Sequence, residues 1–191
     1  IAACSNPKCT DATISTIDSN NGDVGQYSSI AIGANGNPII SYFDATSYAL
    51  KVASCDNPVC TTALTTRFAD NGNVGFHSSI AIGSDGRPVI SYYDATNEDL
   101  KLAACDSSTC SSAHRYTIDT TGNVGEDTSI AIGTDGNPII SYLDRSNYDL
   151  KIAHCGHSRC DPNALNTVIN SYDVMNVSGF YTSIAIGVDG Y

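Results

Sequence analysis

Positive charge and long apolar runs are both scarce in this sequence of 191 residues. Nine Lys and Arg residues stand against 20 Asp and Glu residues, which gives a formal net charge of −11. This excess of negative charge argues against nucleic acid or an anionic membrane surface as a partner. No run of about 18 apolar residues occurs, so we expect no membrane insertion. Charged residues make up only 15% and hydrophobic residues 41%, which excludes a disordered acidic tail.

A helical hydrophobic period is also missing, and the sequence instead repeats itself. The string SSIAIG begins at residues 28 and 78, and TSIAIG begins at residues 128 and 182. An Asn-Gly or Asp-Gly turn signal follows each copy, and a PIISY-like segment and an LKxAxC segment follow the first three. We therefore expect one repeat domain over 1–191. Its parts are a partial repeat 1–27, repeats 28–77, 78–127 and 128–181, and a partial repeat 182–191.

Each repeat contains four strand candidates, which in the first repeat are 28–33, 38–44, 49–55 and 60–69. The Asn-Gly or Asp-Gly between the first two strands is a strong hairpin signal. The PIISY segment is apolar on both faces, which is typical of sheets covered on both sides. The pattern predicts an all-β fold, a β-propeller of four-stranded antiparallel blades with the strand near Ser28 innermost and the cysteine hairpin outermost. A linear β-solenoid is the main alternative, and a sandwich is weaker because it has no reason to repeat its sequence.

The unit SSIAIGxDGxPxISYxD, followed by LKxAxC, resembles the roughly 50-residue repeats of secreted bacterial β-propeller proteins, which are distantly similar to sialidase-like propellers. The resemblance covers nearly the whole chain and implies a fold rather than an activity. Tryptophan is absent altogether. The WD dipeptide and the sialidase Asp-box, S-x-D-x-G-x-x-W, are therefore missing, as is the D-x-D-x-D-G calcium loop of integrin-type propellers. No catalytic residue is carried over from these families.

The eight cysteines fall into four closely spaced pairs: Cys4/Cys9, Cys55/Cys60, Cys105/Cys110 and Cys155/Cys160. Each pair brackets four residues between the third and fourth strands, where a hairpin can bring two side chains to disulfide distance. Zinc is the alternative, but it needs four ligands on one ion, and successive pairs lie a whole blade apart. We expect disulfides within each repeat, no metal, and an oxidising location that is extracellular, at the cell surface or periplasmic.

A Tyr-x-Asp motif closes the second strand of each complete repeat, and a lysine begins the third strand. One interpretation is a repeated carboxylate–phenol site for sugars or cations. The other is structural, with the aspartate capping the turn and the lysine pairing with it across the hairpin. The candidate ligand-binding residues under the first interpretation are Tyr42, Asp44, Tyr92, Asp94, Tyr142 and Asp144.

No catalytic residue and no cofactor is predicted. A catalytic centre that occurs once in the chain would lie among residues that differ from one repeat to the next. The histidines and arginines of this kind are scattered over different repeats: His77, His114, His154, His157, Arg67, Arg87, Arg115, Arg145 and Arg159. Glutamate occurs only at positions 98 and 126, whereas glycoside hydrolysis needs a pair of carboxylates. No G-x-S-x-G elbow, H-E-x-x-H or P-loop is present, so a sialidase-like hydrolase is the less expected outcome.

Two functional classes remain. The first is a non-catalytic secreted or cell-surface propeller that serves as a scaffold, adhesion or binding module. The second is a multivalent, lectin-like propeller, although the absence of Trp counts against it because aromatic platforms usually dominate sugar contacts. Glycans and other surface proteins are the expected partners. Asn176 begins the only N-glycosylation sequon, which matters only in a eukaryotic host.

The phase of the repeats also suggests additional blades. Residues 1–4 align with residues 52–55, inside a third strand, and the last residues lie in the hairpin before a second strand. One blade would therefore lack its PIISY strand and leave an edge uncovered. The sequence also has no initiator Met and no signal segment. We expect the chain to be a processed or trimmed part of a longer ring, or of an assembly that includes copies of the chain.

Overall fold

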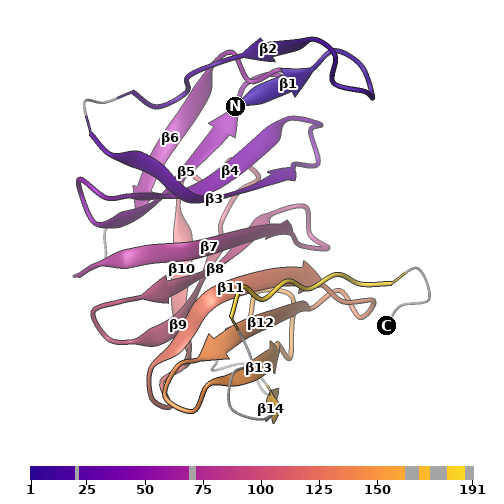
Figure 1. Ribbon diagram of the computed structural model, residues 1–191. Coiled ribbons are helices and arrows are strands. Elements are labelled where there is room, and N and C mark those ends of the chain that lie inside the picture. The colour runs from indigo at the N-terminus through magenta and orange to yellow at the C-terminus, as the bar shows by residue number, and fades with distance from the viewer. Residues whose placement is uncertain (20–21, 69–71, 162–167, 173–179, 188–191) are drawn as a thin grey trace.

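The computed structural model describes residues 1–19, 22–68, 72–161, 168–172 and 180–187, and all statements below concern these residues. A short two-stranded hairpin comes first, formed by β1 (Ala2–Cys4) and β2 (Ala12–Ile14). Three four-stranded antiparallel sheets follow (Figure 1). The sequon residue Asn176 lies outside the described residues.

The strands of each sheet follow one another in space in the order of the chain. The first sheet consists of β3 (Val24–Ile32), β4 (Pro38–Asp44), β5 (Ala49–Cys55) and β6 (Ala63–Phe68). The second consists of β7 (Val74–Ile82), β8 (Pro88–Asp94), β9 (Asp99–Cys105) and β10 (Ala113–Asp119). The third consists of β11 (Val124–Ile132), β12 (Pro138–Asp144), β13 (Asp149–His154) and β14 (Val168–Tyr172).

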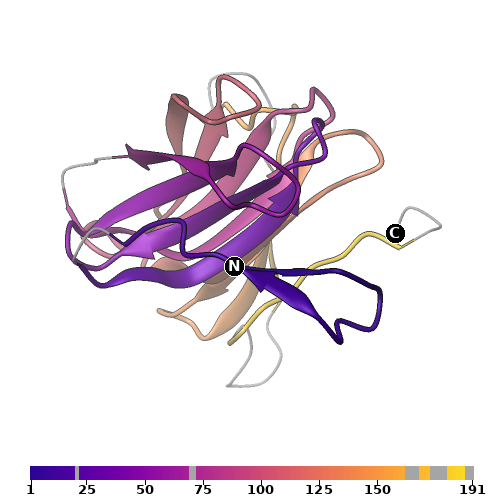
Figure 2. The ribbon, with the colours of Figure 1, turned by 90° about the horizontal axis from the view of Figure 1, so that it is seen from above.

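The three sheets are the blades of a β-propeller, as the repeats predict. Strand β7 packs against β3, β4 and β5, and β11 packs in the same way against β7, β8 and β9. Figure 1 shows β3, β7 and β11 one below another, so the strand that contains Ser28 is the innermost strand of its blade, as expected. Figure 2 shows that the β1–β2 hairpin and residues 180–187 extend to the same side of the blades.

Apolar side chains fill the space between successive blades. Leu50, Val52, Ile90 and Tyr92 belong to one buried cluster that joins the first and second blades. A second cluster of the same kind joins the second and third blades. A blade between two others is thus buried on both faces, which explains why the PIISY segments are apolar on both faces.

The inner strands begin earlier than predicted, and each contains a bulge near its start. The strand continues on the N-terminal side of this bulge. The expected first strand at 28–33 begins at Val24 in the structure. Gln26 pairs with Phe43 and Ser29 pairs with Ser41, so β3 carries an extra residue at this point and the alternation is broken. Tyr27 and Ser28 lie between them, and Tyr27 has a left-handed backbone with φ of 51°. The bulge turns that side chain out of the ordinary alternation of the strand.

In the second and third blades, close packing requires the glycine before the bulge. Gly75 has φ of +107°, and a Cβ atom added to it would lie 2.7 Å from the backbone of Leu50 in the preceding blade. Gly125 meets Leu100 in the same way. No other residue fits between the inner strand and its neighbour at these two positions, which accounts for the Val-Gly pair at the start of β7 and of β11.

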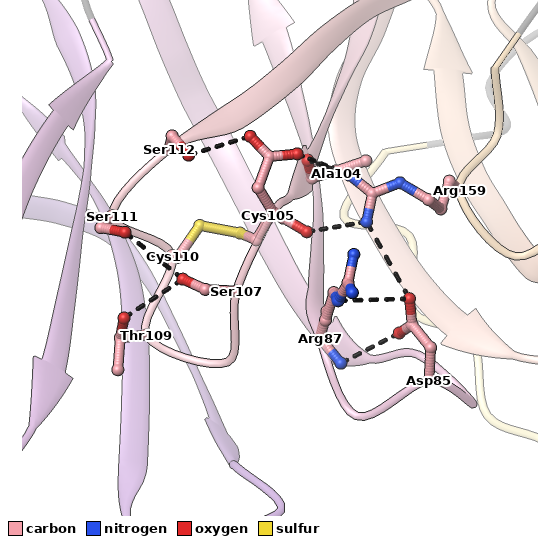
Figure 3. Close-up of a disulfide and its surroundings, with 11 residues drawn as sticks. Asp85, Arg87, Ala104, Cys105, Ser107, Thr109, Cys110, Ser111, Ser112 and Arg159 are labelled. Carbon is pink, nitrogen blue, oxygen red and sulfur yellow. Dashed lines mark hydrogen bonds and ion pairs between the residues drawn. A yellow bond between two sulfur atoms is a disulfide. The ribbon is translucent and has the colours of Figure 1, made fainter.

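All four predicted disulfides are present, and each lies within its own repeat. They close the connections between third and fourth strands, at the ends of the blades opposite to the bulges. Figure 3 shows the Cys105–Cys110 disulfide and the neighbouring Arg159. Four disulfides indicate an oxidising, extracytoplasmic environment. Among the described residues, no helix has the length and apolar character needed to cross a membrane.

Candidate functional site

The six predicted ligand-binding residues lie in the interior. Tyr42, Tyr92 and Tyr142 have exposed fractions of 3% or less. Each aspartate of the motif caps the turn after its strand: Asp144 accepts hydrogen bonds from the backbone amide and the side-chain amide of Asn147, at 3.1 and 3.0 Å. Nζ of Lys151 lies 3.8 Å from Oδ2 of Asp144. This geometry matches the structural interpretation of the motif, and ligand binding by these residues stays a prediction.

A second acidic residue, which sequence reasoning missed, completes the clusters of the first and third blades from the chain segment that precedes each blade. In the third blade, the phenol of Tyr142 donates a 2.8 Å hydrogen bond to Oδ2 of Asp119, the last residue of β10. Nζ of Lys151 lies 2.5 Å from the same oxygen. In the first blade, Asp18 binds Tyr42 at 2.7 Å and also binds Lys51. These aspartates lie in the variable stretch, at different distances from the next Val-Gly pair, so the repeat does not reveal them.

The electrostatics of the cluster follow from this arrangement. Burial alone would raise the pKa of Asp119, but hydrogen bonds from Lys151, the amide of Thr121 and Tyr142 outweigh it and hold the pKa below its ordinary value. Burial and the negative charge of Asp119 raise the pKa of Tyr142 far above its ordinary value. The phenol therefore stays neutral and the carboxylate stays charged over the physiological pH range.

A second feature lies where the bulged ends of the inner strands come together. It is a hollow of about 290 Å³, which we call the axial hollow. Two consecutive residues from each of four repeats line it: Tyr27, Ser28, His77, Ser78, Asp127, Thr128, Tyr181 and Thr182. Four segments far apart in the sequence thus contribute the same structural position to one site.

The first residue of each pair breaks the repeat. Tyr27, His77, Asp127 and Tyr181 occupy equivalent positions, and all four have φ between 51° and 52°. A left-handed backbone is costly for residues other than glycine, and residues in such conformations are concentrated at functional sites. The segment that follows these residues, SSIAIG or TSIAIG, is nearly invariant among the repeats, whereas these residues and the residues directly before them, Gln26, Phe76, Glu126 and Phe180, vary.

The side chains of the axial hollow contact one another. Nδ1 of His77 lies 2.9 Å from Oδ1 of Asp127. The imidazole lies beside the Tyr27 ring, with 4.5 Å between the ring centroids. The backbone amide of Tyr181 donates a 2.9 Å hydrogen bond to Oδ2 of Asp127. The hollow therefore holds a carboxylate and an imidazole between two tyrosines.

The other histidines lie apart from this site. His114 is 3.5 Å from Asp106, and His154 is 2.9 Å from Asp135. His157 lies in a disulfide-closed turn, where its Nε2 contacts the backbone of Asp161. Within the described part of the chain, no two histidines share a carboxylate. The sequence had singled out His77 for breaking the repeat, but Tyr27, Asp127 and Tyr181 were overlooked although they break it in the same way.

A larger hollow of about 510 Å³ lies beside the first blade, between β1 and β3. Asp18 and Tyr42 border it. Ile30 on β3 is 54% exposed, whereas the equivalent Ile80 is 6% exposed because the first blade covers it. This hollow is therefore the uncovered counterpart of an interface between blades, lined by residues that the repeats share.

Comparison with known proteins reveals similarity of fold. The structure resembles part of a bifunctional GH43-CE protein of Bacteroides eggerthii, with a TM-score of 0.52 and 14% sequence identity. The match covers 78% of this chain and 20% of that one, so this chain spans about a fifth of the length of the protein it matches. No protein-family model matches the sequence, and no curated protein matches it.

Proposed function

We propose that this chain is a non-catalytic binding module of an extracellular, cell-surface or periplasmic propeller, and that the axial hollow is its ligand-binding site. It belongs, on this proposal, with the secreted bacterial propeller repeat proteins that its repeats resemble. The observation that carries the proposal is the variation at one structural position. Four different repeats place Tyr27, His77, Asp127 and Tyr181 around one hollow, although the SSIAIG or TSIAIG segments that follow them are nearly identical.

Binding is favoured over catalysis by the composition of the hollow. Among the described residues that line it, Asp127 is the only one with a carboxylate, whereas glycoside hydrolysis uses two. The exposed aromatic surface is instead suited to holding a ligand: Tyr27 is 43% exposed and Tyr181 is 87% exposed. The buried clusters and the disulfides serve as the frame that holds these side chains in place.

Glycans are the ligand class that we propose. The absence of Trp argues against a lectin, but two exposed tyrosines at one hollow supply an aromatic platform of the kind that sugars use. Hydroxyl groups of a sugar can also bond to the carboxylate of Asp127. The buried tyrosines of the Tyr-x-Asp motif offer no comparable surface, because Tyr92 and Tyr142 are fully buried.

A glycan array tests this proposal with fluorescently labelled protein. We expect a discrete set of glycans to bind the wild type, and Tyr27→Ala to abolish their signals. Tyr48→Ala is the matched control, because Tyr48 is also left-handed and exposed, with φ of 52° and 56% exposure, but does not line the hollow. An array without any signal, or equal signals from wild type and Tyr27→Ala, would contradict the proposal.

A further inference from the structure

The axial hollow carries a charge that is only partly compensated, and this indicates what kind of ligand it prefers. We propose that it selects ligands with a primary ammonium group, and that an amino sugar is the simplest such ligand. This inference rests on the proposed function, since it specifies the chemistry of the same site. Three observations carry it: the charge of the lining, the direction of its hydrogen-bonding groups and its exposed aromatic faces.

The first observation is the charge. Among the described residues that line the hollow there is no Lys or Arg, and Asp127 supplies a carboxyl group. One of its oxygens faces His77 and the other accepts the amide of Tyr181. A carboxylate offers about four acceptor positions, so capacity remains for a donor from a ligand. The formal net charge of −11 also raises the local concentration of cations.

The second observation concerns the hydrogen-bonding groups of the lining. In its neutral form, His77 holds its proton on Nδ1, which faces the carboxylate, so Nε2 is an acceptor. None of the described residues is hydrogen-bonded to that Nε2.

Three of the six hydroxyl groups of the described lining residues are already used inside the protein. Those of Ser78, Thr128 and Thr182 bond to protein oxygens 2.6 to 3.0 Å away. An ammonium group has three donors and no acceptor, so it suits acceptors such as the Asp127 carboxylate and Nε2 of His77.

The third observation is the aromatic surface beside the carboxylate. The faces of Tyr27 and Tyr181 are negative and attract cations as well as the apolar faces of sugar rings. Tyr27 is held by its contact with His77 and by Phe76, whose ring centroid is 5.6 Å away. A ring that carries a protonated amine can therefore pack on a tyrosine while its ammonium reaches Asp127 or His77.

The test compares three sugars that differ at one substituent. Glucosamine, N-acetylglucosamine and glucose are titrated at neutral pH, and the ring signals of His77 and Tyr27 are followed by NMR. We expect glucosamine to bind at least about tenfold more tightly than N-acetylglucosamine, which corresponds to about 1.4 kcal/mol. Asp127→Asn should reduce this preference to less than about twofold. Asparagine tolerates a left-handed backbone, so this variant should fold.

Asp85→Asn is the control, because Asp85 is an acidic residue in a turn that does not line the hollow. It should keep the full preference for glucosamine. Butylamine, which carries an ammonium group but no sugar ring, is titrated in the same way. If it binds the wild type and binds Asp127→Asn more weakly, the result supports the ammonium assignment without requiring a ring. Equal binding of the three sugars would overturn the inference and leave the proposed function intact. Failure of both glucosamine and butylamine to bind would also overturn it, whereas the glycan array decides the proposed function separately.

Discussion

The phenol of Tyr142 donates its hydrogen bond to Asp119 across the boundary between two blades. The second blade supplies the carboxylate at the end of β10, and the third blade supplies the phenol and the ammonium of Lys151. The first blade receives Asp18 in the same way from the segment after β2. Each of these blades therefore depends on its predecessor for the counterion of a buried lysine.

Replacing that lysine should be strongly destabilising. Lys151→Met leaves the carboxylates of Asp119 and Asp144 buried without their cation. We expect the free energy of unfolding to fall by about 3 to 5 kcal/mol, measured by chemical denaturation. Lys8→Met, at an exposed position, should change it by less than about 0.5 kcal/mol. A Lys151→Met protein as stable as the control would show that the cluster contributes nothing to stability.

The same cluster predicts how stability depends on pH. The pKa of Asp119 is lower in the folded state than its ordinary value, so its contribution is complete above about pH 4 and is lost as the pH falls further. The pKa of the Tyr142 phenol is raised by burial, and burial raises the pKa of Tyr93 to about 12. Their contributions are complete below about pH 10 and are lost as the pH rises further.

Thermal unfolding measured from acid to alkaline pH should therefore show a plateau between these limits. Asp119→Asn should weaken the dependence on the acid side, and Tyr142→Phe should weaken it on the alkaline side. Both variants should be less stable on the plateau itself, because each loses a buried hydrogen bond to a charged group. Unchanged slopes in both variants would be inconsistent with this account.

The disulfides should contribute unequally although their loops have the same length. Loop entropy predicts about 2 kcal/mol for each. Cys105 and Cys110 are fully buried, whereas Cys4 and Cys9 are exposed. Replacing the buried pair by serines also places two hydroxyl groups in an apolar cluster, so we expect a larger loss of unfolding free energy than for the exposed pair. Denaturation of the two double variants measures this difference.

Mass measurement supplies the chemical check. Four disulfides predict that complete reduction adds eight hydrogen atoms to the chain. A smaller gain after full denaturation and reduction would mean that at least one pair is not bonded.

Arg159 joins the third blade to the second from within the Cys155–Cys160 turn. Its guanidinium donates hydrogen bonds to the carbonyl oxygens of Ala104 and Cys105, at 3.0 and 2.8 Å, and to Asp106 at 3.0 Å (Figure 3). Arg159→Lys keeps the charge but cannot reach all three acceptors at once. We expect it to lower the free energy of unfolding by about 1 to 2 kcal/mol.

Arg87→Lys is the control for this substitution, since that guanidinium is more exposed and lies 3.9 Å from Asp85. It should leave stability within about 0.5 kcal/mol of the wild type. Equal stability of the two variants would exclude a role for Arg159 in holding the blades together.

The sequence predicts the blades well because their signals are local. The Asn-Gly and Asp-Gly turns define the hairpins, and Pro38 begins β4 as expected. The predicted fourth strand at 60–69 is shorter in the structure, at Ala63–Phe68, because Cys60 belongs to the disulfide-closed turn. These features depend on residues close together in the chain, where turn chemistry and alternation are informative.

Contacts between blades are harder to predict. Asp119 comes from a stretch that varies in length and composition, so nothing in the repeat marks it as the partner of Lys151. The axial hollow does have a signal: VGQYSSIAI, VGFHSSIAI and VGEDTSIAI differ only in their third, fourth and fifth letters. The alternation of apolar and polar residues in the sequence gives these positions no special role. The bulge that brings them to one site is visible only in the structure.

The bulge at Tyr27 also has an evolutionary consequence. Its side chain lines the axial hollow, while the packing between the first and second blades depends on Gly75 and on apolar residues such as Leu50 and Ile80. Substitutions at this position can therefore accumulate without disturbing the fold, and duplication of a blade supplies a new one to diversify. A family built from such repeats could exchange one specificity for another by single mutations, in the way that antibody loops diversify on a constant framework.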